Sequence, residues 1–433
     1  MSRNNRAAPP PPESPVPMFG IEIEIFVKLK PDVEQMVRSK QYNGEYLPAY
    51  FQRWRLDLLN DSRDKDKMNE QRSCAAYCIE ALIAQEFGDR VVRWNCELDE
   101  SLVESELKEP RDPRKWWGVE IVSPPLSVKT YWQQEIEQVF EAVGQYFEFW
   151  TTNHTSCHVH VSPGPVKGIE YTRRDVVNVA RGAYFWENAL VDLMPADRKT
   201  PAYAVPNWMM YATSEYNQVT SKSWEPLFKK LKDARGEDRA GLANFVRKMS
   251  GADRDPPRDT KFISHNFKPL LMQKGTIEFR RQAGVASAET AINRALLAVT
   301  LHISARTYDF KKAQSRKSHP SSMELIAELA RCEQLLPPTC KTPKGFVNWL
   351  VQCKEDYSDK NKAFTEKQTN YREAMLHQSS GRSAPAPTAQ STATTSSGRA
   401  NTSTLEVRPS RRVGDNVSFS YDPSNVTYSS LPR

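Results

Sequence analysis

FGIEIEIFV, residues 19–27, alternates apolar and acidic side chains in the way that a β-strand with two different faces requires. Successive side chains of a strand point to opposite faces, so the isoleucines share one face while Glu22 and Glu24 share the other. Two neighbouring carboxylates repel each other, and a divalent cation between them is the usual solution where water does not reach. The alternative is an amphipathic strand with a solvated acidic face, so matching groups on other strands decide between the two interpretations.

The composition is that of a globular protein. The chain has 433 residues, of which 39% are hydrophobic, enough to build a core. The 60 basic and 53 acidic side chains are interleaved, and their net charge of +7 allows anionic ligands without indicating nucleic acid. Seven cysteines without a CxxC pair are typical of reduced thiols. Because neither a signal-peptide core nor an apolar run of about 20 residues occurs, we expect an intracellular, cytoplasmic protein with no membrane partner.

The order of segments predicts one catalytic domain between two disordered ends. Residues 1–17 are proline-rich and polar, and residues 377–433 are rich in Ser, Thr and Pro, compositions that cannot bury enough apolar surface to order themselves. The domain between them is expected over 18–376, with a possible insertion or lid at 195–260. The predicted helices within it include 50–87, 127–150, 171–193 and 288–310.

Three later strand-like stretches carry charged groups in an apolar setting. Ordinary wet faces of antiparallel strands are dominated by Thr, Ser, Lys, Gln and Arg, whereas these stretches present carboxylates and imidazoles. A histidine pair on one strand is also compatible with a structural or solvent-facing role. Only the charged groups of all these strands together indicate a binding site. The groups are Glu120 in residues 117–122, His158 and His160 in residues 156–161, and Glu278 and Arg280 in residues 275–282.

This set of side chains predicts a site for divalent metal ions and phosphate. Carboxylate oxygens suit Mg²⁺ or Mn²⁺, and imidazole tolerates Mn²⁺ well. Magnesium sites keep waters and bridge to substrate phosphates, which gives Arg280 and Arg281 a role as phosphate ligands. The arrangement therefore favours nucleotide phosphoryl chemistry over hydrolysis at zinc.

The motifs also follow a familiar order along the chain. They are GIEIE (20–24), DESL (99–102), GVEIVSPPL (118–126), SCHVHVSPG (156–164), the HN of FISHNF (262–267) and TIEFRR (276–281). In content and order this set resembles the fungal amidoligases, members of the carboxylate–amine ligase group with the fold of glutamine synthetase and glutamate–cysteine ligase. The resemblance covers residues 18–310, nearly the whole predicted domain.

The resemblance implies an α+β fold, in which a curved antiparallel sheet has helices on its convex side and two or three Mg²⁺ or Mn²⁺ ions on its concave face. It also implies ATP as the nucleotide. In this family's pattern Glu22 and Glu24 bind different metal ions, and Glu120, His158 or His160, and Glu278 complete the sites. Arg280 holds the phosphate being transferred, Glu278 and Arg280 are the catalytic pair, and Asn266, Asp99 and Arg281 approach nucleotide or substrate.

The reaction that the resemblance implies forms an amide or peptide bond. A substrate carboxylate attacks the γ-phosphate of ATP to give an acyl phosphate, and an amine then displaces phosphate. The acid and the amine are expected to be small molecules or protein side chains. The sequence leaves open which of Glu97, Asp99 and Glu100 faces the site.

Other functions remain alternatives. An HxH strand also occurs in zinc-dependent hydrolases of the amidohydrolase type, but these need further ligating histidines, and His265, His302 and His319 lack strand contexts that support such a role. Ten tryptophans, sixteen tyrosines and a pI near 8.9 are compatible with a nucleic-acid-binding protein, although the conspicuous carboxylates would repel a phosphate backbone. A catalytically silent relative of the ligases is the third alternative.

Overall fold

The computed structural model describes residues 17–39, 51, 65–88, 94–99, 102, 116–164, 169–199, 204–253, 261–340, 342 and 345–358. All of them belong to one compact unit, residues 1–384, whereas a second unit, residues 385–433, lies outside the described residues. The predictions of disorder for the proline-rich N-terminal segment and for the C-terminal tail therefore fall outside the described residues, apart from residue 17.

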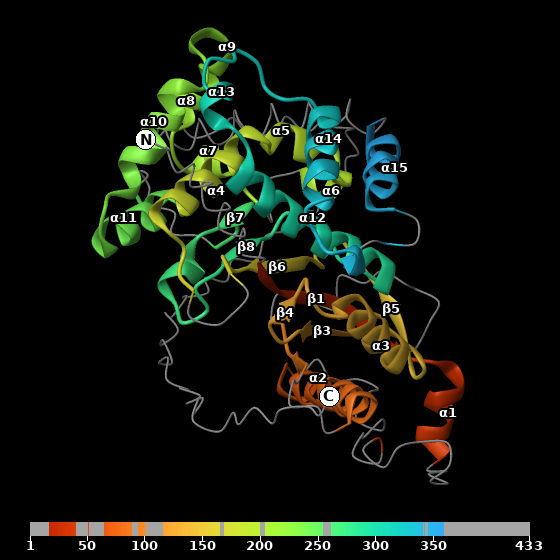
Figure 1. Cartoon of the computed structure of the whole chain (residues 1–433). Coiled ribbons are helices and arrows are strands. Elements are labelled where there is room, and N and C mark those ends of the chain that lie inside the picture. The colour runs from red at the N-terminus through yellow and green to blue at the C-terminus, as the bar shows by residue number, and fades with distance from the viewer. Residues whose placement is uncertain are drawn as a thin grey trace, which may run out of the picture. The chain divides into compact units, whose positions relative to one another are not determined.

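One antiparallel sheet of eight strands organises this unit (Figure 1), and it confirms the predicted mixture of helices with an antiparallel sheet. The hydrogen-bonded order is β2-β3-β1-β6-β8-β7, and β4 and β5 also pair with the long strand β1. The strands are β1 Met18–Leu29, β2 Asn95–Glu97, β3 Trp117–Val122, β4 Leu126–Ser127, β5 Phe147–Trp150, β6 Cys157–Val161, β7 His265–Asn266 and β8 Ile277–Phe279.

The sheet is not strongly curled, in contrast to the curved sheet expected from the sequence. Strands β2, β7 and β8, which form its two ends, are only two or three residues long. Twist and coiling accumulate along and across strands, so such short end strands add little of either.

Helices make up most of the remaining described residues. The first group is α1 Pro31–Ser39, α2 Lys65–Phe87, α3 Trp132–Gly144, α4 Arg173–Phe185, α5 Glu187–Asp192, α6 Ala196–Lys199, α7 Asn207–Met210 and α8 Thr213–Asn217. The second group is α9 Val219–Lys222, α10 Glu225–Arg235, α11 Arg239–Met249, η4 Lys268–Leu271, α12 Ala288–Thr307, α13 Phe310–Ala313, α14 Ser322–Glu333, η5 Pro338–Cys340 and α15 Phe346–Ser358. None of the described helices combines the length and the apolar character needed to cross a membrane.

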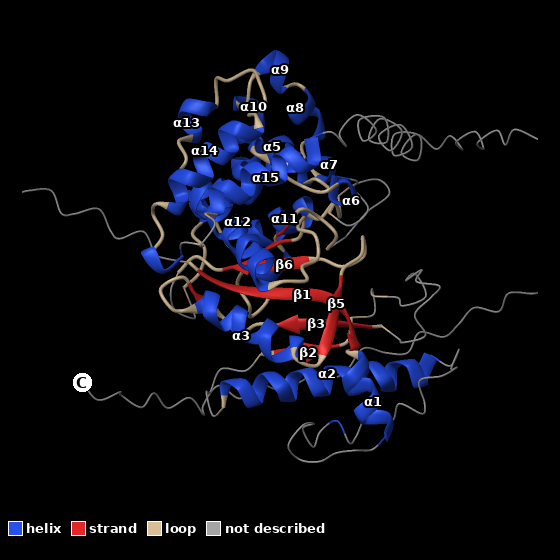
Figure 2. Cartoon of the chain, turned by 90° about the vertical axis from the view of Figure 1, so that its right-hand side faces the viewer, coloured by secondary structure: helices blue, strands red, loops and turns tan. Residues whose placement is uncertain are grey.

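The apolar face of the sheet is covered by helices (Figure 2). Ile21, Ile23 and Ile25 of β1 are each 0% exposed and belong to the main hydrophobic core. Helix α12 packs against β1 and β6, α3 packs against β5, and α2 packs against β2 and β3. The alternation predicted for β1 is therefore confirmed on its apolar side.

The region expected to be an insertion or a lid, residues 195–260, contains α6 to α11. Trp224 and Leu227 are 0% exposed and lie in the same hydrophobic core as the sheet residues. Helix α10 packs on α4, and α11 packs on η4. The region thus contributes to the core, and its role as a lid stays a prediction.

The helix predicted over 127–150 is wrong at both ends. Strand β4 occupies its start, the helix itself is α3, and strand β5 occupies its end. In β5 two phenylalanines alternate with Glu148 and Trp150, and the strand pairs with the far end of β1. Pairing with a distant strand overrode the local helical pattern. By contrast, the helices predicted over 171–193 and 288–310 are confirmed by α4 with α5 and by α12.

The central position of Ile23 leads to a stability prediction. Ile23→Ala should lower the free energy of unfolding by about 2–5 kcal/mol, because it removes buried methyl groups from the middle of β1 and leaves a cavity. Leu335→Ala, a truncation at a side chain that is 56% exposed, should change it by less than about 1 kcal/mol. Urea denaturation with an unchanged m-value measures both, and equal losses would contradict the assignment of Ile23 to the core.

Candidate functional site

The polar face of the sheet gathers the predicted residues in three neighbouring rows. Residues directly opposite each other on antiparallel strands have Cβ atoms about 4.5–5.5 Å apart, so the register alone brings together side chains from six strands. The rows are Glu24, Glu120 and Glu97; Glu22 and His158; and His160, Glu278 and Asn266.

Most side chains of these rows are buried, whereas Glu22 and Glu120 are partly buried and Glu97 is exposed. Glu24 is 5% exposed, His158 is 3%, His160 is 8% and Glu278 is 3%. A face of the sheet that water solvated would leave its carboxylates exposed. The burial of Glu24 and Glu278 beside the histidines differs from the fully solvated acidic face that the sequence allowed as an alternative.

Both histidines contact the carboxylates. His158 Nδ1 lies 3.4 Å from Glu24 Oε1, 3.7 Å from Glu22 Oε2 and 3.7 Å from Glu278 Oε1. His160 Nε2 lies 3.0 Å from Glu22 Oε1 and 3.9 Å from Glu278 Oε1. Glu22 thus uses one oxygen toward each histidine and connects the two halves of the cluster.

Two groups of three side chains have the geometry of metal ligands. Their ligand atoms lie within 4.8 Å of one another, and both groups contain Glu22. Ligand atoms that bind one Mg²⁺ at about 2.1 Å are at most about 4.2 Å apart, so each group would need only a small contraction. Glu24 lies beside the second group through its contact with His158. The groups are Glu22, His160 and Glu278, and Glu22, Glu120 and His158.

The electrostatics of Glu120 indicate an excess of negative charge at this site. Burial raises the pKa of Glu120 to about 8. The negative charges of the surrounding carboxylates, Glu22, Glu24, Asp99 and Glu97, act in the same direction. Among the described residues, the charges that act most strongly on Glu120 are all negative. The donor set and this excess of negative charge fit a divalent cation.

Glu22 and Glu278 have partners of their own. Burial acts to raise the pKa of Glu22, but its hydrogen bonds with the two histidines and the charge of Lys274 outweigh burial and lower it. For Glu278 the charges of Arg280 and of the histidines likewise outweigh burial and lower the pKa. Both carboxylates are therefore held in the ionised form that can bind a metal ion.

Glu278 is held by two donors. Arg280 Nη1 donates to Glu278 Oε1, and Asn266 Nδ2 donates to Glu278 Oε2 at 2.7 Å. The structure thus places Arg280 and Asn266 beside the cluster, and their predicted roles in binding phosphate and nucleotide stay predictions. Asn266 contacts Glu278 there and orients it, a role that the sequence did not suggest.

Thr276 is a functional residue that sequence reasoning missed. Its Oγ1 lies 3.0 Å from His160 Nδ1, so the other ring nitrogen, Nε2, points toward Glu22. An outer partner of this kind fixes the ring orientation and the tautomer of a metal-binding histidine. The signal was available, because strand alternation places Thr276 on the same face as Glu278 and Arg280.

Arg281 does not lie at the cluster. Strand alternation directs it to the opposite face from Arg280, where it is 2% exposed. Its guanidinium group donates to the carboxylate of Glu187, to Ser264 Oγ at 3.1 Å and to the carbonyl oxygen of Arg198 at 3.0 Å. Glu187 lies 94 residues earlier in the chain, so no local pattern could have indicated this ion pair.

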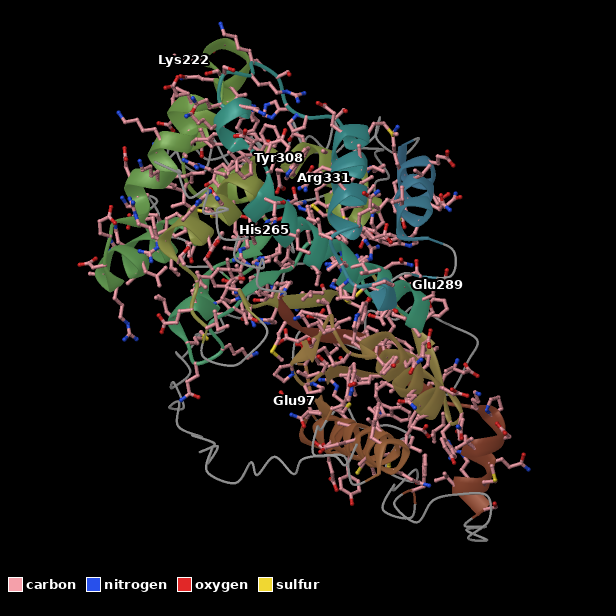
Figure 3. The ribbon with its side chains drawn as sticks, viewed as in Figure 1. Glu97, Lys222, His265, Glu289, Tyr308 and Arg331 are labelled. Carbon is pink, nitrogen blue, oxygen red and sulfur yellow. The ribbon has the colours of Figure 1, made fainter. Side chains whose placement is uncertain are left out.

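Of the three carboxylates at the end of β2 and in the loop after it, two act on the cluster. Glu97 lies directly opposite Glu120, and the charge of Asp99 contributes to the raised pKa of Glu120. Glu100 is outside the described residues. Figure 3 labels Glu97 on one end strand of the sheet and His265 on the other, and the strands that carry the two ligand groups lie between them.

The three further histidines that a zinc hydrolase would need lie elsewhere. His265 packs against the ring of Phe279, and burial with the charge of Arg281 lowers its pKa to about 3. His302 is 0% exposed beside Tyr171. His319 packs between aromatic rings of the helical region. The described residues therefore provide two histidines and several carboxylates to the site, a donor set typical of Mg²⁺ or Mn²⁺ rather than of zinc.

The chain matches a known protein family. Residues 16–302, about two thirds of the chain, match the family described as "Putative amidoligase enzyme". The matched stretch contains all eight strands of the sheet and most of α12. No curated protein matches the chain.

The contact between Thr276 and His160 can be tested by metal binding. Thr276→Val should weaken binding of Mn²⁺ by about 10- to 100-fold, because Nδ1 of His160 loses the partner that orients the ring. Thr276→Ser retains the hydroxyl group and should bind Mn²⁺ as the parent protein does. Electron paramagnetic resonance of free Mn²⁺ measures the affinity. Equal affinities for the valine and serine variants would show that Thr276 does not orient His160.

Proposed function

The chain belongs to the amidoligase family that its residues 16–302 match, and we propose that it is an ATP-dependent carboxylate–amine ligase that acts at a centre of Mg²⁺ or Mn²⁺ ions. One observation carries this proposal. Glu22 belongs to two groups of metal-ligand geometry on one face of the sheet, in which His158, His160 and Glu278 are buried and Glu22 and Glu120 are partly buried. The proposal includes a relationship of this sheet to that of glutamine synthetase and glutamate–cysteine ligase, supported by the placement of the ligands on one face and of helices on the other.

The proposed metal ligands are the side chains of the three rows. One ion would be held by Glu22, His160 and Glu278, and a second by Glu22, Glu120 and His158, with Glu24 beside it. When bound, these ions would neutralise the carboxylates and the phosphate oxygens and polarise the transferred phosphoryl group.

The reaction brings two anions together. An oxygen of the substrate carboxylate attacks the γ-phosphorus of ATP, the bond from that phosphorus to the bridging oxygen breaks, and ADP leaves. The nitrogen of the amine then attacks the acyl carbon, the bond from carbon to the phosphate oxygen breaks, and the amine loses a proton. Charge neutralisation is therefore the main requirement on the protein.

The residues of the chain would divide this work. The buried guanidinium group of Arg280 is oriented by Glu278 and would stabilise the charge of the phosphoryl group in transfer. Asn266 keeps Glu278 in place. Asp99, at the other end of the cluster near Glu120, would face the nucleotide or the substrates. Both substrates are proposed to be small molecules or protein side chains that carry a carboxylate and an amine.

The metal centre predicts metal-dependent nucleotide binding. Calorimetric titration with a non-hydrolysable ATP analogue should show binding in the presence of Mg²⁺ or Mn²⁺ and none in the presence of EDTA. Glu24→Gln and Glu278→Gln should weaken it by at least about tenfold while the protein stays folded, because each removes a charge from the centre. Glu141→Gln, on an exposed position of α3, is the matched control. No binding under any condition, with stoichiometric zinc in the purified protein, would favour the hydrolase instead.

The acyl phosphate can be tested with hydroxylamine in place of the amine. A panel of amino acids and dicarboxylic acids, incubated with ATP, Mg²⁺ and hydroxylamine, should include an acid that yields a hydroxamate together with an equal amount of ADP. Arg280→Lys should lower the rate by about 100-fold or more, since it removes the planar donor from the developing charge. Release of amine from an amide without ATP would contradict the ligase.

A further inference from the structure

Lys274 is a cationic side chain at the site that no motif predicted. It lies in the turn of residues 272–275, between η4 and β8, where Gly275 has a positive φ of 57°. The N–H of Gly275 donates to the carbonyl oxygens of Pro269 in η4 at 3.1 Å and of Met272 at 3.2 Å. Lys274 Nζ lies 3.2 Å from Glu22 Oε1. The turn therefore places an ammonium group on the carboxylate that both ligand groups share.

The ammonium group and a metal ion would compete for the same oxygen. Glu22 Oε1 also lies 3.0 Å from His160 Nε2, inside the first ligand group. Two cations cannot share that oxygen at close range without strong repulsion. Occupation of the first group by a divalent ion would therefore drive Lys274 away from Glu22.

Lys274 is suited to such an exchange of partners, unlike the other cation of the site. Its side chain is 59% exposed and its flexible stem carries a point charge, so it can leave Glu22 at small cost. The side chain of Arg280 is only 10% exposed and donates to Glu278. Arg280 is fixed in the site, and Lys274 can move at its rim.

We propose, on the basis of the proposed function, that Lys274 is a nucleotide-binding residue that serves as the counterion of Glu22 in the free protein and contacts a phosphate oxygen of the nucleoside triphosphate once metal ions are bound. The displaced ammonium group remains at the rim of the site, where it needs an anion. A triphosphate supplies several charged oxygens at that place, and lysine commonly binds phosphate as a point charge.

The inference predicts opposite effects on two kinds of binding. Removal of the charge in Lys274→Met removes a competitor, so the free protein should bind Mn²⁺ about three- to fivefold more tightly. The same variant loses a charged hydrogen bond to phosphate, so the metal-loaded protein should bind the ATP analogue about tenfold more weakly. A residue with only a structural role would not strengthen one kind of binding and weaken the other.

The experiment measures both affinities by calorimetry on the full-length chain. MnCl₂ is titrated into the metal-free protein, and the β,γ-imido analogue of ATP is titrated into the Mn²⁺-saturated protein. The variants are Lys274→Met and Lys274→Arg, the second of which keeps the charge and should resemble the parent in both titrations. Lys317→Met, at an exposed position between α13 and α14, makes the same change of charge away from the cluster and serves as the matched control.

Each outcome has a distinct meaning. Tighter Mn²⁺ binding and weaker nucleotide binding, confined to Lys274→Met, would support the inference. Affinities within twofold of the parent in both titrations would overturn it and leave an ordinary surface ion pair. Tighter Mn²⁺ binding with unchanged nucleotide affinity would also overturn it, because Lys274 would then be a counterion alone. If the parent protein binds neither Mn²⁺ nor the nucleotide analogue, the proposed function itself fails.

Discussion

Repulsion between carboxylates on one face of a sheet is the constraint that the rest of this structure has to satisfy. Glu24, Glu120 and Glu97 lie directly opposite one another on adjacent strands, an arrangement that destabilises a sheet when nothing neutralises it. The opposite face of β1 supplies the stabilisation, because each fully buried isoleucine contributes about 1.5–3 kcal/mol. The apolar core therefore allows the sheet to keep an unfavourable charge pattern in place.

Hydrogen bonds at the edge of the cluster then determine how its members point. Arg280 and Asn266 hold the two oxygens of Glu278, and Thr276 turns the ring of His160. These partners are Asn266 in the short strand β7 and the residues directly before and after β8, so one end of the sheet supplies the groups that orient the cluster. A site on strands with fixed partners is held more closely than a site on loops.

The sequence predicts what is local in this protein and misses what is distant. Strand alternation is local, and it correctly placed the predicted carboxylates and histidines on one face. The same rule places Arg280 and Arg281 on opposite faces of the strand. The prediction that both bind phosphate did not apply this rule. The partner of Arg281, Glu187, is a matter of tertiary packing, as is the pairing of β5 with β1 that replaced the end of a predicted helix. The limited curl of the sheet depends likewise on the lengths of strands that pair across the whole domain.

The position of Glu22 in both ligand groups has a thermodynamic consequence. Two ions that share a carboxylate cannot occupy their positions independently, because each changes the free energy with which the other binds, and by the same amount. The first ion would relieve the repulsion among the remaining carboxylates and would also draw electron density from the shared oxygens. The balance of these two effects would determine the cooperativity of metal binding. Occupancy of the two positions would therefore change together as the concentration of divalent cations rises.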